Sequence, residues 1–365
     1  MVAVRAGLPI GSQDGVWIRQ EATVATQARR GAAELGRRIG LRAARLSEIE
    51  LAVTEVAVNL NKHAVDGALL LRLVECGDGV AVELLAIDHG PGMADVADAR
   101  QDGVSSAGTL GIGLGAVERL ADGFDVFSLP GRGTVLVARF RERPEGYRHV
   151  AAACPEPAVA GVTRPLSGEE VCGDAWATRL APAPSQGADT AGGAATLVML
   201  CDGLGHGPLA ARASEQAVAA FHRSTSADPG ELLTAMHQAL GGTRGGAVAV
   251  ARIDPDGRRA SYCGVGNISG FVVADGRRNT LLSAPGIVGH HLPRLRVFDL
   301  ALPAGASLIL HSDGLNERWA PAALPGLFQC SSTVIAGHLL RESAVRRDDA
   351  GIVVVGDAAA AQGAP

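Results

Sequence analysis

Two apolar runs that each end in Asp-Gly constrain this chain most strongly. TLVMLCDG delivers Asp202 and SLILHSDG delivers Asp313. Their nearly unbroken Val, Leu, Ile and Met content predicts strands that are buried on both faces. If these strands are neighbours, their carboxylates meet at one sheet edge, where adjacent like charges are tolerated only with a cation between them. The pattern therefore predicts a metal site.

Two further acidic positions extend this prediction. Asp174 lies in EEVCGDAWA, and Asp348 and Asp349 open the apolar strand AGIVVVGD. Asp-Gly is also a common turn signal, which is the structural alternative. Four acidic positions with hard oxygen donors favour a binuclear Mg²⁺ or Mn²⁺ site. Two such ions can activate a shared water for in-line attack on phosphate without a covalent nucleophile.

The N-terminal half carries residues suited to a nucleotide. Glu55 and Asn59 lie four apart on a predicted helix and share one face. Asp88 ends a predicted strand, where its carboxylate can accept a hydrogen bond from an exocyclic amine. Glycines follow that allow close approach of the backbone and offer N–H groups to phosphates before a helix: Gly90, Gly92, Gly108, Gly111, Gly113 and Gly115. The alternative is a solvated helix face and plain turns.

The length of 365 residues predicts two domains, residues 1–145 and 154–358, with a linker at 146–153 and a flexible tail at 359–365. A helix is expected over 21–40, and a second should start at a Ser47/Glu50 capping box. Two hairpins should follow, the second around Pro130-Gly131. The second half alternates strands at 193–201, 245–253, 260–274 and 306–312 with helices at 208–223, 229–240 and 333–344, which predicts an α+β class.

Composition excludes several kinds of partner. The net charge is −5 with scattered Arg, so nucleic acid is not expected. The sequence shows neither a leader pattern nor 18 uninterrupted apolar residues, so a soluble cytoplasmic protein is expected, without membrane contact. Six cysteines lie far apart with no CxxC pair, and reduced, structural thiols are therefore expected.

The N-terminal motifs E-x-x-x-N, D-x-G-x-G, GTLGIGLG and GRGT resemble the GHKL ATPase fold over about residues 20–140, in its anti-sigma serine kinase group (RsbW/RsbT-like). The resemblance implies an α/β sandwich with helices on one face of an antiparallel sheet. It also implies that ATP binds with Mg²⁺ held by Asn59, and that Glu55 acts as a general base or positions a water. Asp88 would read adenine, and Thr134 would support that nucleobase.

The C-terminal series GD, D-G-x-G-H-G, GNISG, SDGLNE and DDA resembles the PPM phosphatases in their sporulation-protein-E branch, with RsbX-like enzymes. The resemblance implies a β-sandwich flanked by helices. Asp202 would bridge two metals and the Gly203 carbonyl would bind one. Asp313 and Asp348 would complete the other, and Asp174 would act at the second metal.

Three positions depart from the family pattern or stay open. Gly351 replaces the usual Thr of DDAT, so Asp349 competes with Asp348 as the ligand. His206 lies two residues later than the His of the eukaryotic relatives, and is either a general acid or a turn residue. His290-His291 is read as a surface loop, because adjacent residues on an extended segment point opposite ways.

Two hypotheses for the whole chain follow. In the first, the chain is a bifunctional regulator that dephosphorylates phosphoserine or phosphothreonine on a partner, expected to be a STAS-domain anti-sigma antagonist, and its ATP-binding domain phosphorylates that class of partner. In the second, the N-terminal domain is a non-catalytic module that captures a STAS protein or a sigma factor and regulates the phosphatase. A sensor histidine kinase is not favoured, because no phosphoacceptor helix is recognised.

Overall fold

The computed structural model of the 365-residue chain describes residues 15–77, 79–100, 113–143, 154, 156–181, 193–345 and 347–357. The chain divides into two compact units, residues 1–157 and 158–365. The predicted linker and tail, 146–153 and 359–365, lie outside the described residues. None of the helices in the described part of the chain carries an apolar run long enough to span a membrane.

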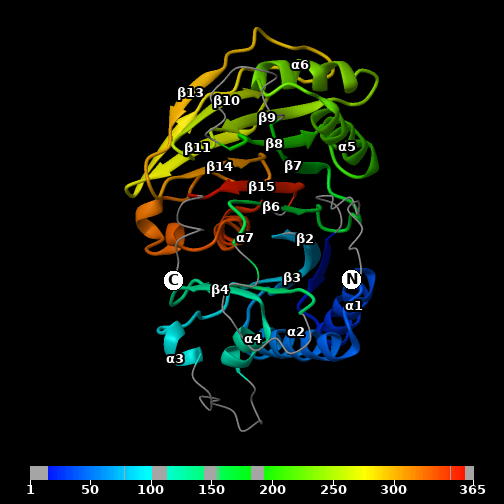
Figure 1. Cartoon of the computed structure of the whole chain (residues 1–365), viewed down its shortest axis with the longest axis vertical. Coiled ribbons are helices and arrows are strands. Elements are labelled where there is room, and N and C mark those ends of the chain that lie inside the picture. The colour runs from blue at the N-terminus through cyan, green and yellow to red at the C-terminus, as the bar shows by residue number, and fades with distance from the viewer. Residues whose placement is uncertain are drawn as a thin grey trace. The chain divides into compact units, whose positions relative to one another are not determined.

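The first unit is an antiparallel sheet with helices packed on one face (Figure 1). The strand order is β1-β2-β3-β5-β4. Leu69, Leu71 and Leu73 alternate along β2 into a core shared with α1 and α2, as a half-covered strand requires. The predicted hairpins and fold class are confirmed. The elements are β1 (Val16–Arg19), α1 (Val24–Arg38), α2 (Ala43–His63), β2 (Ala68–Cys76), β3 (Gly79–Ile87), α3 (Val96–Arg100), α4 (Leu114–Leu120), β4 (Gly123–Ser128) and β5 (Thr134–Phe140).

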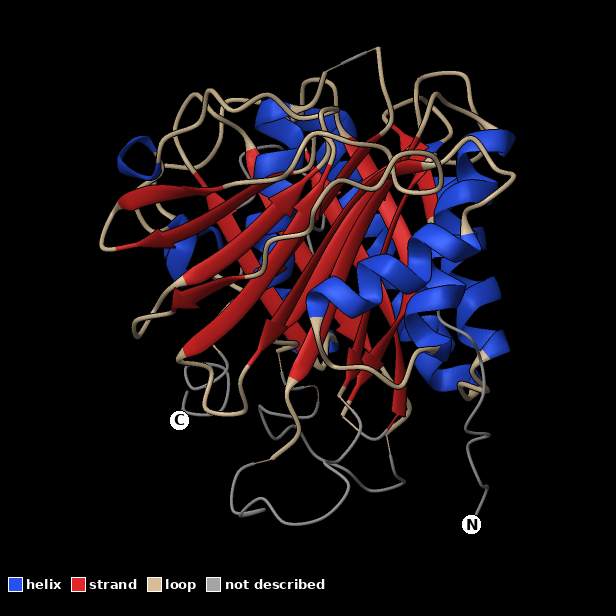
Figure 2. Ribbon diagram, turned by 90° about the horizontal axis from the view of Figure 1, so that it is seen from above, coloured by secondary structure: helices blue, strands red, loops and turns tan. Residues whose placement is uncertain are grey.

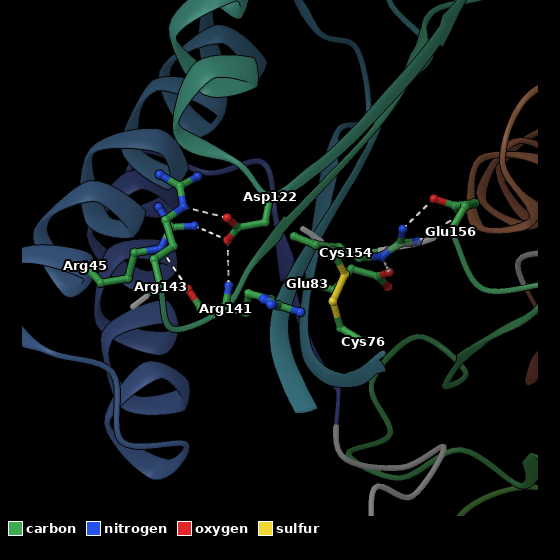
Figure 3. The surroundings of a disulfide bond; sticks show 9 residues. Arg45, Cys76, Glu83, Asp122, Arg141, Arg143, Cys154 and Glu156 are labelled. Atoms are coloured by element: carbon green, nitrogen blue, oxygen red, sulfur yellow. Dashed lines mark hydrogen bonds and ion pairs between the residues drawn. A yellow bond between two sulfur atoms is a disulfide. The ribbon is translucent and has the colours of Figure 1, made fainter. Parts of the chain in front are cut away.

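Helix α2 begins four residues earlier than the capping box predicts. Ser47 lies inside the helix, where its hydroxyl donates to the Ala43 carbonyl (3.1 Å). The earlier start is held by a tertiary contact, because the buried Arg45 guanidinium binds the buried Asp122 carboxylate (Figure 3). A local cap signal was therefore overridden by a long-range ion pair.

The expectation that all six cysteines are reduced is wrong, because Cys76 and Cys154 form a disulfide (Figure 3). Cys76 ends β2, and Cys154 lies against it with the Cα atoms 5.3 Å apart, within bonding reach. Their separation of 78 residues hid this pairing from spacing rules. Nearby, buried Arg139 joins Glu83 (2.7 Å) and Glu156 (2.5 Å). The other four cysteines, Cys172, Cys201, Cys263 and Cys330, are not part of this disulfide.

Removing this disulfide is expected to destabilise the first unit. Closing a loop of 78 residues restricts the unfolded chain, so Cys154→Ser should lower its free energy of unfolding by about 2–4 kcal/mol under oxidising conditions. Urea titration with hydrogen exchange of the β2 and β3 amides measures this. Cys330→Ser, at a cysteine of the second unit outside this disulfide, is the control. Equal stability of oxidised wild type and Cys154→Ser would contradict the prediction.

The second unit is a sandwich of two antiparallel sheets, ordered β13-β10-β9-β8-β7 and β12-β11-β14-β15-β6. Side chains from both sheets fill one core, including Leu200, Ala249, Leu310 and Val353. The strands are β6 (Val159–Arg164), β7 (Asp174–Leu180), β8 (Thr196–Gly203), β9 (Gly246–Ile253), β10 (Arg259–Val265), β11 (Ser269–Ala274), β12 (Arg277–Leu281), β13 (Phe298–Ala301), β14 (Ser307–His311) and β15 (Ala350–Val355).

Helices flank these strands, which confirms the predicted architecture (Figure 2). Phe221 of α5 and Leu233 of α6 pack with Met199 and Val250 of the first sheet in a second core. The remaining helix, α7, contacts β6 and β15 of the other sheet. The predicted single strand over 260–274 is two strands, because the chain turns at Gly266 with φ +91°. The helices are α5 (Pro208–Arg223), α6 (Pro229–Ala239) and α7 (Ser332–Ser343).

Candidate nucleotide site and acidic centre

In the first unit, the loop after β3 joins two other segments around Asp88. The Asp88 N–H donates to the Thr134 carbonyl at the start of β5 (3.0 Å), and the His89 N–H donates to the Val65 carbonyl beyond α2 (2.8 Å). The Asp88 carboxylate accepts from the Gly90 N–H (2.7 Å). These bonds bring the end of α2, the Asp88 loop and the β5 hairpin together.

Gly92 shows why this loop needs glycine. Its φ is +67°, and a Cβ there would lie 2.0 Å from the Leu129 carbonyl oxygen, which no side chain could tolerate. The Gly131 N–H also donates to the Pro91 carbonyl (2.7 Å), tying the β4–β5 turn to the same loop. At Gly92 the close approach is thus to the Leu129 carbonyl of the protein itself, whereas the approach predicted from the sequence was to a ligand.

The remaining N-terminal candidates lie on α2, at α4 or outside the described residues. Glu55 and Asn59 are half-buried on α2, and burial raises the pKa of Glu55 while Lys62 opposes the shift. Gly113 caps α4 and Gly115 is buried within it. Gly111 lies outside the described part of the chain, and with it most of the glycine-rich stretch.

The second unit gathers its acidic residues at one end of the sandwich. Asp202 ends β8 directly opposite Asp174 on β7. Asp313 follows β14 in the other sheet, so the condition under which the two carboxylates would meet at one sheet edge, that the two Asp-Gly strands are neighbours, is not met. The carboxylates still converge because the sheets face each other, and the Ser312 hydroxyl, next to Asp313, donates to the Asp174 Oδ2 (2.6 Å) across the sandwich.

Burial and mutual repulsion raise the pKa values of the carboxylates at this end of the sandwich. Burial, together with the charges of Asp174, Asp313 and Asp348, raises the pKa of Asp202 to about 9. Burial likewise raises the pKa of Asp174 to about 8, against the Ser312 hydrogen bond. The pKa of Asp348 is raised by burial and by Asp313. A cluster that disfavours its own ionisation in this way is suited to a cation.

Asp348 and Asp349 differ in what they contact. Asp349 is buried, and its two carboxylate oxygens accept from the backbone N–H groups of Leu166 (2.7 Å) and Gly173 (2.9 Å). The Asp348 Oδ1 accepts only a local bond from the Asp349 N–H (2.9 Å) among the hydrogen bonds of the described residues. Across those same residues, no three acidic, His or Cys side chains stand close enough to hold an ion without adjustment.

Gly351, the departure from the family pattern, fits closely against this cluster. A Cβ at Gly351 would lie 3.0 Å from both the Cβ and Oδ2 of Asp174, which leaves little room for a larger residue. Its N–H donates to the Ser312 hydroxyl (2.9 Å), which in turn reaches Asp174. A hydroxyl therefore still contacts this carboxylate, although it comes from the neighbouring strand.

Three polar residues contact side chains of the acidic motifs, although the sequence pattern had given them no role. Ser312 binds Asp174 as described, and the Asn267 amide of GNISG donates to the Asp313 Oδ2 (2.6 Å). Glu169 lies 2.9 Å from the exposed His206 ring, between Oε1 and Nδ1. In the sequence, the only sign that these three residues belong to the site was that they lie within or beside the acidic motifs. Their hydrogen-bond partners could not be predicted, because those partners are 37 to 138 residues away in the chain.

Comparison with known proteins now identifies both halves. Residues 18–140 match the family "Histidine kinase-like ATPase domain". Over 92 residues the chain is 35% identical to the serine/threonine-protein kinase RsbT of Bacillus subtilis, covering 25% of this chain and 69% of RsbT. The chain belongs to this ATPase family. Its first unit is an RsbT-like ATPase domain, as the motifs predicted.

The second unit of this ATPase-family protein is a SpoIIE-type phosphatase domain. Residues 192–341 match the family "Stage II sporulation protein E (SpoIIE)". Over 151 residues the chain is 24% identical to the phosphoserine phosphatase RsbX of Bacillus subtilis, covering 41% of this chain and 70% of RsbX. A crystal structure of RsbX in complex with magnesium is 22% identical, with a TM-score of 0.46, and covers 54% of this chain and 94% of that chain.

Proposed function

We propose that the SpoIIE-type domain hydrolyses phosphoserine or phosphothreonine on a partner protein in a metal-dependent reaction. The carrying observation is the buried Asp174–Asp202 pair with Asp313 and Asp348 beside it. Mutual repulsion of these carboxylates is relieved by divalent cations, and an all-oxygen donor set fits Mg²⁺ or Mn²⁺. When bound, two such ions supply Lewis-acid activation of the phosphate and of the attacking water.

Within this proposal the acidic residues have different roles. Asp202 and the Gly203 carbonyl would hold the ions, and Asp174, Asp313 and Asp348 would complete the set. Asp348 is preferred to Asp349 as a ligand, because two backbone N–H groups already occupy the Asp349 carboxylate. Asp349 instead anchors Gly173, the residue before Asp174. Asn267 and Ser312 orient Asp313 and Asp174 through their hydrogen bonds.

The proposed substrate is a phosphorylated regulatory protein of the STAS class, with a sigma factor as a further binding partner. Two named relatives support a protein phosphorylated on serine or threonine as the substrate, since RsbT is a serine/threonine-protein kinase and RsbX a phosphoserine phosphatase. The test is release of phosphate from a phosphorylated STAS protein by chelator-treated enzyme, with Mg²⁺ or Mn²⁺ added back. Comparing the two metals decides which one serves, and release without metal would contradict the proposal.

For the first unit we propose ATP binding and transfer of its γ-phosphate to the same class of partner. Asn59 would hold Mg²⁺, Asp88 would accept from adenine beside Gly90, Gly92 and Thr134, and the glycines up to Gly115 would bind phosphates. Glu55 would act as the base, and its raised pKa supports that role. Use of ATP favours the cytoplasm as the compartment in which both domains act.

Glu55→Ala is expected to abolish labelling of the partner by γ-labelled ATP while leaving ATP binding within a few-fold of wild type. The reason is that a base contributes to transfer, typically about 100- to 10,000-fold, more than to binding. Glu50→Ala, one turn earlier on α2 and half-buried as Glu55 is, is the matched control. Partner labelling that persists in Glu55→Ala, or is missing in wild type that binds ATP, favours the non-catalytic module instead.

A further inference from the structure

Arg244 stands beside the loop that carries Asp202, although no acidic or glycine motif includes it. Strands β8 and β9 are antiparallel, with Gly203 opposite Gly246. The Leu204 N–H also donates to the Gly245 carbonyl (3.0 Å). Arg244 therefore enters β9 at the same end of the sheet at which β8 delivers Asp202.

The Arg244 guanidinium lies directly against this loop. A Cβ on Gly205 would be 2.8 Å from the Arg244 Nη1, and Gly205 has a φ of +89°, so glycine is what allows this approach. On another side, a Cβ on Gly173 would be 3.4 Å from the Gly205 carbonyl oxygen. The Gly205 backbone therefore lies between the Arg244 guanidinium and Gly173, the residue that precedes Asp174.

The guanidinium has no partner among the described residues, in which it makes neither an ion pair nor a hydrogen bond, and its side chain is exposed. Its backbone, in contrast, is fixed. The Gly245 N–H donates to the Thr243 hydroxyl (3.0 Å), and the Gly246 N–H donates to the Val288 carbonyl (3.0 Å). An arginine whose backbone is fixed, and whose guanidinium N–H groups have no hydrogen-bond partner among the described residues, is available to bind an anion.

We infer that Arg244 binds the phosphate group of the substrate, donating guanidinium N–H groups to its non-bridging oxygens. This inference rests on the proposed phosphatase function. A phosphate dianion approaching four carboxylates needs positive charge at the rim of the centre as well as metal within it. A guanidinium also offers two parallel donors that match two oxygens of a phosphate, which a lysine ammonium does not.

Arg244→Ala is expected to raise KM about 10- to 100-fold, with a smaller change in kcat. The factor should be similar for a phosphoserine peptide and for p-nitrophenyl phosphate, because they share only the phosphate. The inhibition constant for inorganic phosphate should rise by the same factor, and Arg244→Lys should recover part of the loss. Arg259→Ala is the control: Arg259 is an exposed arginine at the opposite end of the same sheet, and its replacement should change none of these values.

Inhibition by inorganic phosphate that is unchanged in Arg244→Ala would overturn the inference. So would a KM increase confined to the peptide, which would indicate contact with the protein part of the substrate. Arg244→Gln replaces the alanine variant if the latter does not fold. If wild type hydrolyses nothing, the proposed function fails, and calorimetric titration of inorganic phosphate into the Mg²⁺-supplemented protein decides the inference separately: weaker binding in Arg244→Ala supports it, and equal binding overturns it.

Discussion

Asp202→Asn is expected to reduce metal-dependent phosphate release on the order of 100- to 1000-fold, the loss that corresponds to several kcal/mol of transition-state stabilisation. Asp202 faces Asp174 across β7 and β8, and the charges of Asp313 and Asp348 act on it, so its carboxylate lies within the acidic cluster. An asparagine keeps the shape of the side chain but loses the charge that a bridging ligand needs. Phosphate release from the phosphorylated partner measures the effect.

The expected loss should be specific to the acidic centre. Asp313→Asn should behave like Asp202→Asn, because it removes a proposed metal ligand that the opposite sheet contributes. Asp299→Asn, an exposed position on β13, should retain wild-type activity and controls for a general effect of removing an acid. Full activity in both Asp202→Asn and Asp313→Asn would show that phosphate release does not depend on this centre.

Without metal, the second unit is expected to lose stability as the pH rises from about 4 to about 9. A carboxyl whose pKa is higher in the folded protein than in the unfolded chain holds its proton more tightly when folded. Its contribution is therefore full at low pH and is lost as the pH climbs from about 4, the ordinary value, through about 8 for Asp174 and about 9 for Asp202. Above that range the unscreened repulsion acts against folding.

Divalent metal should reverse this loss. At 100 times its dissociation constant, Mg²⁺ or Mn²⁺ is expected to raise the unfolding temperature of this unit by about 5–10 °C at pH 8, and by less at pH 5, where protons compete for the carboxylates. Thermal unfolding followed by tryptophan fluorescence in a Trp17→Phe background reports the second unit, which holds Trp176 and Trp319, the other two of the three tryptophans.

Asp202→Asn provides the internal comparison for this second experiment. Because it removes one of the repelling charges, the metal-free variant should unfold at a higher temperature than metal-free wild type at pH 8. It should also respond little to added metal. An unfolding temperature of wild type that is the same with and without metal at pH 8 would contradict the prediction, whatever the activity measurements give.

The candidate sites were largely predictable because their key residues sit in local patterns. A buried strand that ends in Asp-Gly is visible in eight consecutive residues, and the Glu55/Asn59 pair needs only helical spacing. Short strands with polar residues gave no such signal: β7 and β12 contain arginine and threonine, and β1 has four residues. Their pairing with longer neighbours makes them strands, and hydrophobic periodicity does not report pairing.

The sequence by itself determined the two folds, the acidic residues of the centre and the loop around Asp88. Tertiary structure alone decided that Asp202 and Asp313 come from opposite sheets, that Asp349 is engaged by backbone N–H groups, and that Cys76 bonds to Cys154. It also placed Arg244 against Gly205. The physical reason is range: periodicity and turn chemistry act over a few residues, whereas these contacts join residues 39 to 183 positions apart in the chain and depend on how the sheets pack.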